Sequence, residues 1–95
     1  MAYVAGDVTA RVDHFLEYCS QEWETVPSYV KEFPTWDESE QLAFVHEWAI
    51  RESGLAVLKD YARQHLLTPE QWQRYRDLLA IVARHRPAID RLLQD

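Results

Sequence analysis

Residues 66–71, Leu-Leu-Thr-Pro-Glu-Gln, decide how this chain folds. Thr68 and Gln71 have the spacing of a capping box, in which each side chain bonds the backbone N–H of the other residue at the start of a helix. Pro69 falls at the first helical position, where its missing N–H has no intrahelical partner to lose. A second helical pattern ends at about Leu66. The stretch therefore predicts an antiparallel hairpin of two helices, 36–66 and 69–94.

The helix predicted over 69–94 carries one apolar face. Its members recur at helical spacings and are Trp72, Tyr75, Leu78, Leu79, Val82, Ile89, Leu92 and Leu93. Pro87 interrupts the pattern, and proline inside a helix removes a hydrogen bond and clashes with the preceding turn. Because the apolar face resumes in phase after Pro87, we expect a kink or a break near that residue.

The helix predicted over 36–66 begins at a second capping box, with Thr35 as the N-cap and Glu38 as the third helical residue. Acidic side chains in the first turn suit the positive end of the helix dipole. Gly54 is the one weak position, since glycine costs about 1 kcal/mol relative to alanine inside a helix. It marks either a bend or a close contact with another helix.

A first helix is predicted over 8–25. Its apolar face consists of Val8, Val12, Phe15, Leu16, Cys19, Trp23 and Val26. Pro27 should end this helix, because proline disfavours the α conformation for the residue before it. Residues 27–35 then form a connector with one short turn at 28–32. Tyr29, Val30 and Phe33 should anchor this connector to the core.

The expected fold is all-α. It is a small bundle of three main helices, 8–25, 36–66 and 69–94, within a single domain, 1–95. No segment shows the sustained alternation of a strand. The chain has 95 residues, of which 47% are hydrophobic, with two glycines and four prolines, so it has enough apolar surface for one core and few breaks between elements.

Charge is unevenly distributed along the chain. Residues 1–50 hold two basic and ten acidic residues, a net charge of −8, whereas residues 51–95 hold eight basic and six acidic, a net charge of +2. This division predicts charge-complementary contacts, either within the fold or between chains, and ordinary surface variation is the alternative. The single cysteine, Cys19, excludes an internal disulfide and is expected to be a small core residue, which fits a cytoplasmic protein. No signal peptide and no membrane span are predicted.

The patterns typical of enzymes are missing. The four histidines form no HxxxH pair and no Glu-x-x-His motif; His14 with Glu17 and Asp13 with Glu17 are the pairs that could share one helical face. No phosphate-binding or dinucleotide-binding glycine pattern occurs. We therefore expect no catalytic residues, no metal site and no cofactor, and Glu47 with Arg51 is expected to be a helix-stabilising ion pair.

The helix over 36–66 suggests a partner. Its 31 residues would extend ~46 Å, longer than a small domain is wide. Its first half is apolar on more than one side, through Leu42, Ala43, Phe44, Val45, Trp48, Ala49 and Ile50. Either it is the central helix of the bundle or a second chain covers part of it. The predicted protein interface is Trp36, Phe44, Trp48 and Ile50, and a homodimer is the default form.

The function predicted from these features is a non-enzymatic protein–protein interaction module, a homodimer or a small regulatory or adaptor protein, whose acidic half steers it toward a basic partner. The alternative is a DNA-binding transcriptional regulator or antitoxin-like protein that uses Arg74, Arg76, Arg84, Arg86 and Arg91. A pI of about 5.1 disfavours phosphate binding. A pocket for a small molecule among Trp36, Phe44, Trp48 and Trp72 is a further possibility.

Overall fold

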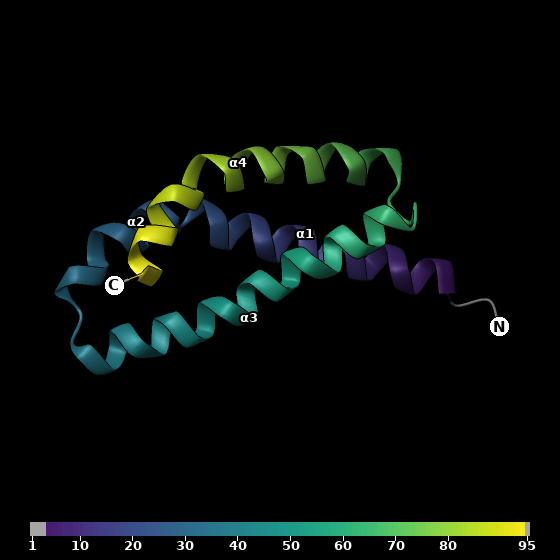
Figure 1. Cartoon of the computed structure of the whole chain (residues 1–95). Helices are drawn as coiled ribbons and strands as arrows, with labels where there is room; N and C mark the ends of the chain where they lie inside the picture. Colours follow the sequence, from purple (N-terminus) through teal and green to yellow (C-terminus); the bar gives the residue numbers. More distant parts are fainter. Residues whose placement is uncertain (1–3, 95) are drawn as a thin grey trace.

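The computed structural model describes residues 4–94, with side chains from residue 8 onward (Figure 1). Its elements are α1 (Val4–Glu24), α2 (Val26–Glu32), the 3-10 turn η1 (Phe33–Thr35), α3 (Glu38–Arg63) and α4 (Pro69–Gln94). The described part of the chain has no strand, and α1 and α2 together make one helix bent at Thr25. The predicted all-α bundle of three main helices is thus confirmed.

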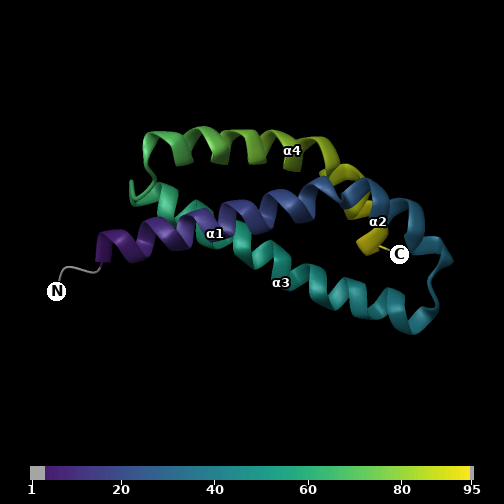
Figure 2. The ribbon, with the colours of Figure 1, turned by 180° about the vertical axis from the view of Figure 1, so that it is seen from behind.

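Helix α1 lies between the other two long helices (Figures 1 and 2). It packs against α4 on one side and α3 on the other, while α2 packs against the C-terminal part of α4. Helices α3 and α4 are antiparallel and diverge from the turn that joins them. The central helix is therefore α1, and α3 is a peripheral helix with one side on the core.

The core runs along the length of an elongated molecule of 49 × 25 × 17 Å. Three aromatic side chains of the core pack together. Trp23 of α1 contacts Trp48 of α3 edge to face, with 5.1 Å between ring centroids, and Phe44 stacks on Trp48 at 5.7 Å. The buried apolar residues are Val12, Leu16, Cys19, Trp23, Val26, Phe44, Trp48, Leu58, Ala62, Leu67, Tyr75, Leu78, Val82 and Ile89. Tyr29, Val30 and Phe33 pack on this core, as expected of the segment after α1.

The start of α4 is as predicted. The Thr68 hydroxyl accepts from the Gln71 N–H at 3.1 Å, and the Gln71 amide oxygen accepts from the Thr68 N–H at 3.0 Å. The Gln71 amide nitrogen then donates to the Asp13 carboxylate at 2.8 Å and to the Thr9 carbonyl at 3.0 Å. These bonds satisfy a buried amide and fix the start of α4 against α1.

The start of α3 lies two residues later than predicted. Asp37, not Thr35, is the N-cap, and its carboxylate accepts from the Glu40 N–H at 2.8 Å. Glu40 rather than Glu38 completes the box by accepting from the Asp37 N–H at 3.3 Å. The Thr35 hydroxyl instead donates to the Glu32 carbonyl at 2.6 Å, within η1. The sequence contains two overlapping capping patterns, Thr35 with Glu38 and Asp37 with Glu40. Because the Thr35 hydroxyl is used within η1, α3 begins at the second pattern.

The segment around Pro27 is more helical than predicted. The expected termination at Pro27 was wrong, because Val26 is helical and Pro27 lies in the first turn of α2. The first N–H groups of a helix lack intrahelical partners, so a proline is tolerated there. The chain bends at Thr25, whose hydroxyl donates to the Gln21 carbonyl at 2.7 Å. Helix α1 also begins at Val4 rather than Val8.

The two expected irregularities within α3 and α4 are resolved. Helix α4 is continuous through Pro87 and kinks there, and its C-terminal turns run at an angle to the rest in Figure 1. Helix α3 continues through Gly54, which is buried against α1. A Cβ atom at this position would lie 3.2 Å from Cys19 Sγ. Gly54 therefore allows a close contact between α1 and α3.

The turn between α3 and α4 depends on one left-handed residue. His65 has a φ of 60°, the only positive value among the described non-glycine residues. The Leu66 N–H bonds the Tyr61 carbonyl at 3.1 Å, and the His65 N–H bonds the Ala62 carbonyl at 3.0 Å. These bonds form a Schellman motif, which ends α3 and turns the chain into α4.

Candidate interaction surface

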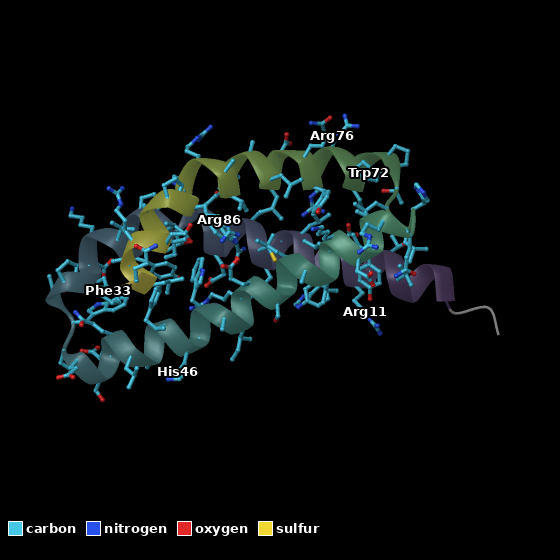
Figure 3. All side chains as sticks on the ribbon, viewed as in Figure 1. Arg11, Phe33, His46, Trp72, Arg76 and Arg86 are labelled. Atoms are coloured by element: carbon cyan, nitrogen blue, oxygen red, sulfur yellow. The ribbon has the colours of Figure 1, made fainter. Side chains whose placement is uncertain are left out.

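Helix α3 presents two different sides. Its inner side is buried on α1, whereas its outer side is open to solvent along the helix (Figure 3). The outer face consists of Leu42, Val45, His46, Ala49, Ile50, Ser53, Ala56 and Val57, which we call the α3 outer face. Leu42 and Ile50 are 59% and 68% exposed, and Figure 3 shows His46 on the side of α3 that faces away from α1 and α4.

The composition of the α3 outer face is unusual for an exposed helix side. None of its eight residues is Asp, Glu, Lys or Arg, although 27% of the whole chain is charged. Ala49, Ser53 and Ala56 are small and lie at helical spacing, so another helix could approach closely there. Solvent-facing helix sides normally carry charged residues, and a continuous apolar one marks a binding surface.

Two shallow hollows border the α3 outer face. One, of about 260 Å³, lies between α1 and α3 and includes His14, Tyr18, Ile50 and Val57 in its lining. The other, of about 270 Å³, lies at the opposite end, and its lining consists of the apolar Phe33, Leu42, Val45 and Leu92 together with Glu38 and Gln41. These hollows widen the apolar surface beyond α3 and give it concave edges that could receive protruding side chains.

Two charged residues in the middle of α3, Arg51 and Glu52, turn inward. Arg51 forms an ion pair with Glu22 of α1, and the Tyr29 hydroxyl donates to the same Glu22 oxygen at 3.1 Å. The predicted pair of Arg51 with Glu47 is not among the ion pairs of the described residues. Glu52 pairs with Arg86 of α4. These groups stabilise contacts within the bundle, and the opposite side of α3 carries no charged residue between Leu42 and Val57.

The four predicted interface residues do not form one surface. Trp48 and Phe44 are 1% and 5% exposed and belong to the core. Trp36 is half-buried at the edge of the aromatic cluster, 5.5 Å from Phe44 between ring centroids. Ile50 alone lies on the α3 outer face, where it is joined by residues that the prediction did not select, such as Leu42 and Ala49.

The C-terminal arginines are divided between ion pairs and solvent. Arg74 lies 3.3 Å from Asp13, and Arg86 donates to Glu52 at 2.9 and 3.0 Å. Arg76, Arg84 and Arg91 are exposed, and Arg76 points away from α1 and α3 in Figure 3. Two of the five cations are therefore engaged with carboxylates and three remain available for a phosphate backbone.

The Asp13–Arg74 and Glu22–Arg51 pairs join the acidic half of the chain to the basic half. Charge complementarity within the fold, one of the two arrangements expected from the sequence, thus accounts for part of the charge division. The acidic groups left over at the N-terminal end of α3 remain exposed, and they include Glu38, Glu40 and Glu47.

Nucleophilic and metal-binding chemistry has little support among the described residues. Burial, with a smaller contribution from Glu22, raises the pKa of the Cys19 thiol to about 11, so the reactive thiolate is scarce at neutral pH. No group of three or more His, Cys, Asp and Glu side chains in residues 8–94 is arranged to hold a metal ion. None of the helices described is both long and apolar enough to cross a membrane.

Comparison of the chain with protein-family models, with curated proteins and with solved structures finds no match in any of the three.

Proposed function

We propose that this protein is a non-enzymatic interaction module that pairs with a second copy of itself through the α3 outer face. The observation that carries the proposal is the face from Leu42 to Val57, which has no Asp, Glu, Lys or Arg and of whose eight residues six are apolar and six are exposed. Exposing this face to water is unfavourable, and covering it releases about 25 cal/mol for each Å² of apolar surface buried. Self-pairing is the commonest way in which soluble proteins cover such a face.

The charges at the two ends of α3 favour an antiparallel pair. Glu38 and Glu40 lie at the N-terminal end, whereas Lys59, Asp60 and Arg63 lie at the C-terminal end, which has a net charge of +1. Glu38 is 12 residues before Ile50 and Arg63 is 13 residues after it, so an antiparallel pair centred near Ile50 puts these residues opposite each other. At about 100° per residue, both lie on the same flank of the helix. A parallel pair would place like charges together.

The α3 outer face by itself is smaller than a standard interface. Its 16 positions from Leu42 to Val57 extend ~24 Å along a helix ~10 Å wide, and the bordering hollows add parts of α1 and of the end of α4. A standard interface buries ~800 Å² on each partner. To reach that size, the pair must also bury the bordering parts of α1 and α4, and the small residues at the centre of the α3 outer face permit close packing.

The experiment is a measurement of absolute mass by light scattering, made on the wild type and two variants. Ile50→Glu places a charge at the centre of the α3 outer face, and Leu79→Glu places the same charge on α4, where Leu79 is 43% exposed. We expect the wild type and Leu79→Glu at twice 11.3 kDa and Ile50→Glu at 11.3 kDa, all with the same helical circular dichroism. A monomeric wild type, or a dimer that tolerates Ile50→Glu, would overturn the proposal.

A further inference from the structure

A third hollow, of about 310 Å³, lies away from the α3 outer face. It is formed where the segment before α3 folds back onto the first turns of that helix. Its lining residues are Tyr29, Trp36, Glu40, Ala43, Phe44, Glu47 and Arg51. None of the residues of the α3 outer face is among them, so the hollow and that face use different side chains.

The shape of the hollow follows from the helical repeat of α3. Glu40, Ala43, Glu47 and Arg51 are spaced by three or four residues and therefore form one stripe along the helix. Ala43 is small and exposed, which leaves room between the two glutamates. Tyr29 of α2 and Trp36, which precedes α3, supply aromatic walls.

The charges around the hollow are unbalanced. The positive charge of Arg51 is compensated by Glu22, with which it forms an ion pair. Among the described residues, neither Glu40 nor Glu47 forms an ion pair with a cation, so the hollow carries a net charge of −2. Glu40 is also held in place, because its carboxylate accepts from the Asp37 N–H at 3.3 Å in the capping box.

The aromatic walls favour the same sign of charge. The faces of tryptophan and tyrosine rings attract cations, by about 0.5–2 kcal/mol. One such contact is already present beside the hollow. The Arg51 guanidinium lies 5.8 Å from the ring centroid of Tyr29 and 5.9 Å from that of Trp48. Trp36 is half-buried, so part of its surface remains open to the hollow.

We infer that this hollow binds the side chain of a lysine or an arginine presented by a basic partner protein. The cationic group lies above Ala43 between Glu40 and Glu47, and the aliphatic stem lies against Trp36 and Phe44. An aliphatic stem that ends in a charge matches a hollow with an aromatic wall and an acidic rim. This inference goes beyond self-pairing, because it uses different residues and a different class of partner.

The buried Arg51 guanidinium defines the competing outcome. Its Nη1 atom has no hydrogen-bond partner among the described residues, which would suit an anion. That atom is buried, however, and an anion entering the hollow would pass between two carboxylates. The balance of charge therefore favours a cation, and an anionic probe is included in the test.

The test is an NMR titration with amino acid derivatives, followed through the indole N–H signal of Trp36 and the amide signal of Ala43. The probes are Nα-acetyl-lysine methylamide and Nα-acetyl-arginine methylamide, with the norleucine derivative as a neutral analogue of lysine and the glutamate derivative as an anion. We expect saturable shifts with the two cations and none with the other two. Saturable binding of the glutamate derivative, or binding of the norleucine derivative equal to that of the lysine derivative, would overturn the inference.

Matched variants locate the effect. Glu40→Gln with Glu47→Gln removes the acidic rim while keeping an amide that can complete the capping box. Glu17→Gln with Glu70→Gln removes the same amount of charge outside the hollow. We expect the first pair to weaken binding of the lysine probe by about five- to tenfold and the second pair to change it by less than about twofold. Equal effects would reduce the binding to general charge attraction and contradict the inference. Repeating the titration with Ile50→Asn, which adds a polar but uncharged group to the α3 outer face, separates this site from self-pairing.

Discussion

Arg86 of α4 and Glu52 of α3 form a bidentate pair, with Nη1 at 3.0 Å from Oε2 and Nη2 at 2.9 Å from Oε1. The Arg86 guanidinium also lies 4.9 Å from the ring centroid of Trp23 in α1. One side chain thus connects all three long helices at the level where α3 and α4 have diverged. The hydrogen bonds with Glu52 raise the pKa of Arg86 above its ordinary value, so its charge persists across the accessible pH range.

The Arg86–Glu52 pair should contribute measurably to stability. We predict that Arg86→Met, which keeps part of the packing against Trp23, lowers the free energy of unfolding by about 1–2 kcal/mol. Both side chains are partly exposed, at 38% and 32%, which limits the effect. Urea denaturation of Arg86→Met, Glu52→Gln and the double variant gives the coupling energy, expected at about 1 kcal/mol. Strict additivity would show that the pair contributes nothing.

Replacing Gly54 with alanine should increase stability once the sulfur atom of Cys19 is removed. Alanine improves helix propensity by about 1 kcal/mol, but its Cβ atom would lie 3.2 Å from Cys19 Sγ. We therefore expect Gly54→Ala alone to change the free energy of unfolding little, and to gain about 1 kcal/mol when made in a Cys19→Ala background. Thermal denaturation of the four proteins tests this. The same change in both backgrounds would exclude crowding by the sulfur atom.

Replacing His65 with glycine should increase the stability of the protein. Its φ of 60° is costly for a residue with a Cβ atom and free for glycine, which is preferred at this position of the Schellman motif. We predict that His65→Gly raises the free energy of unfolding by about 0.5–1 kcal/mol. Gln64→Gly is the matched control. Gln64 has a φ of −86°, so replacing it with glycine should lower the free energy of unfolding of the protein. Destabilisation by both would contradict the assigned turn.

Burial of Cys19 should make stability depend on alkaline pH. Desolvation, helped by Glu22, raises the pKa of this thiol from 9.0 to about 11. The folded chain therefore favours the neutral thiol, so the contribution of this group is complete below about pH 9 and is lost as the pH rises toward 11. We predict that the difference in free energy of unfolding between wild type and Cys19→Ala shrinks over that interval. A constant difference would contradict the burial of the thiol.

Local sequence signals predicted the start of a helix correctly where the sequence offered only one capping pattern. Thr68 and Gln71, with Pro69 between them, offer a single way to start α4, and the structure has it. Thr35 and Glu38 overlap with Asp37 and Glu40, and only the fold of η1 decides between them. At Pro27 the usual rule for helix ends failed because the proline lies in the first turn of a second helix.

The candidate surface was harder to predict than the helices. Trp48 and Ile50 are two residues apart, and both are large and apolar, yet one is 1% and the other 68% exposed. Periodicity shows that α3 is apolar on more than one side, but it does not say which side α1 will cover. That choice depends on long-range contacts, such as the close approach of Gly54 to Cys19.

The most direct test of the central proposal is an isotope-filtered NOE measurement on a mixed sample of labelled and unlabelled chains. We predict intermolecular contacts among Ala49, Ile50 and Ser53 at the centre of α3, and between Leu42 of one copy and Val57 of the other, as an antiparallel pair requires. Contacts of Leu42 with its own counterpart would indicate a parallel pair. Intermolecular contacts confined to residues outside the α3 outer face would contradict the proposed self-pairing. So would a sample that shows no intermolecular contacts and has the mass of one chain, 11.3 kDa.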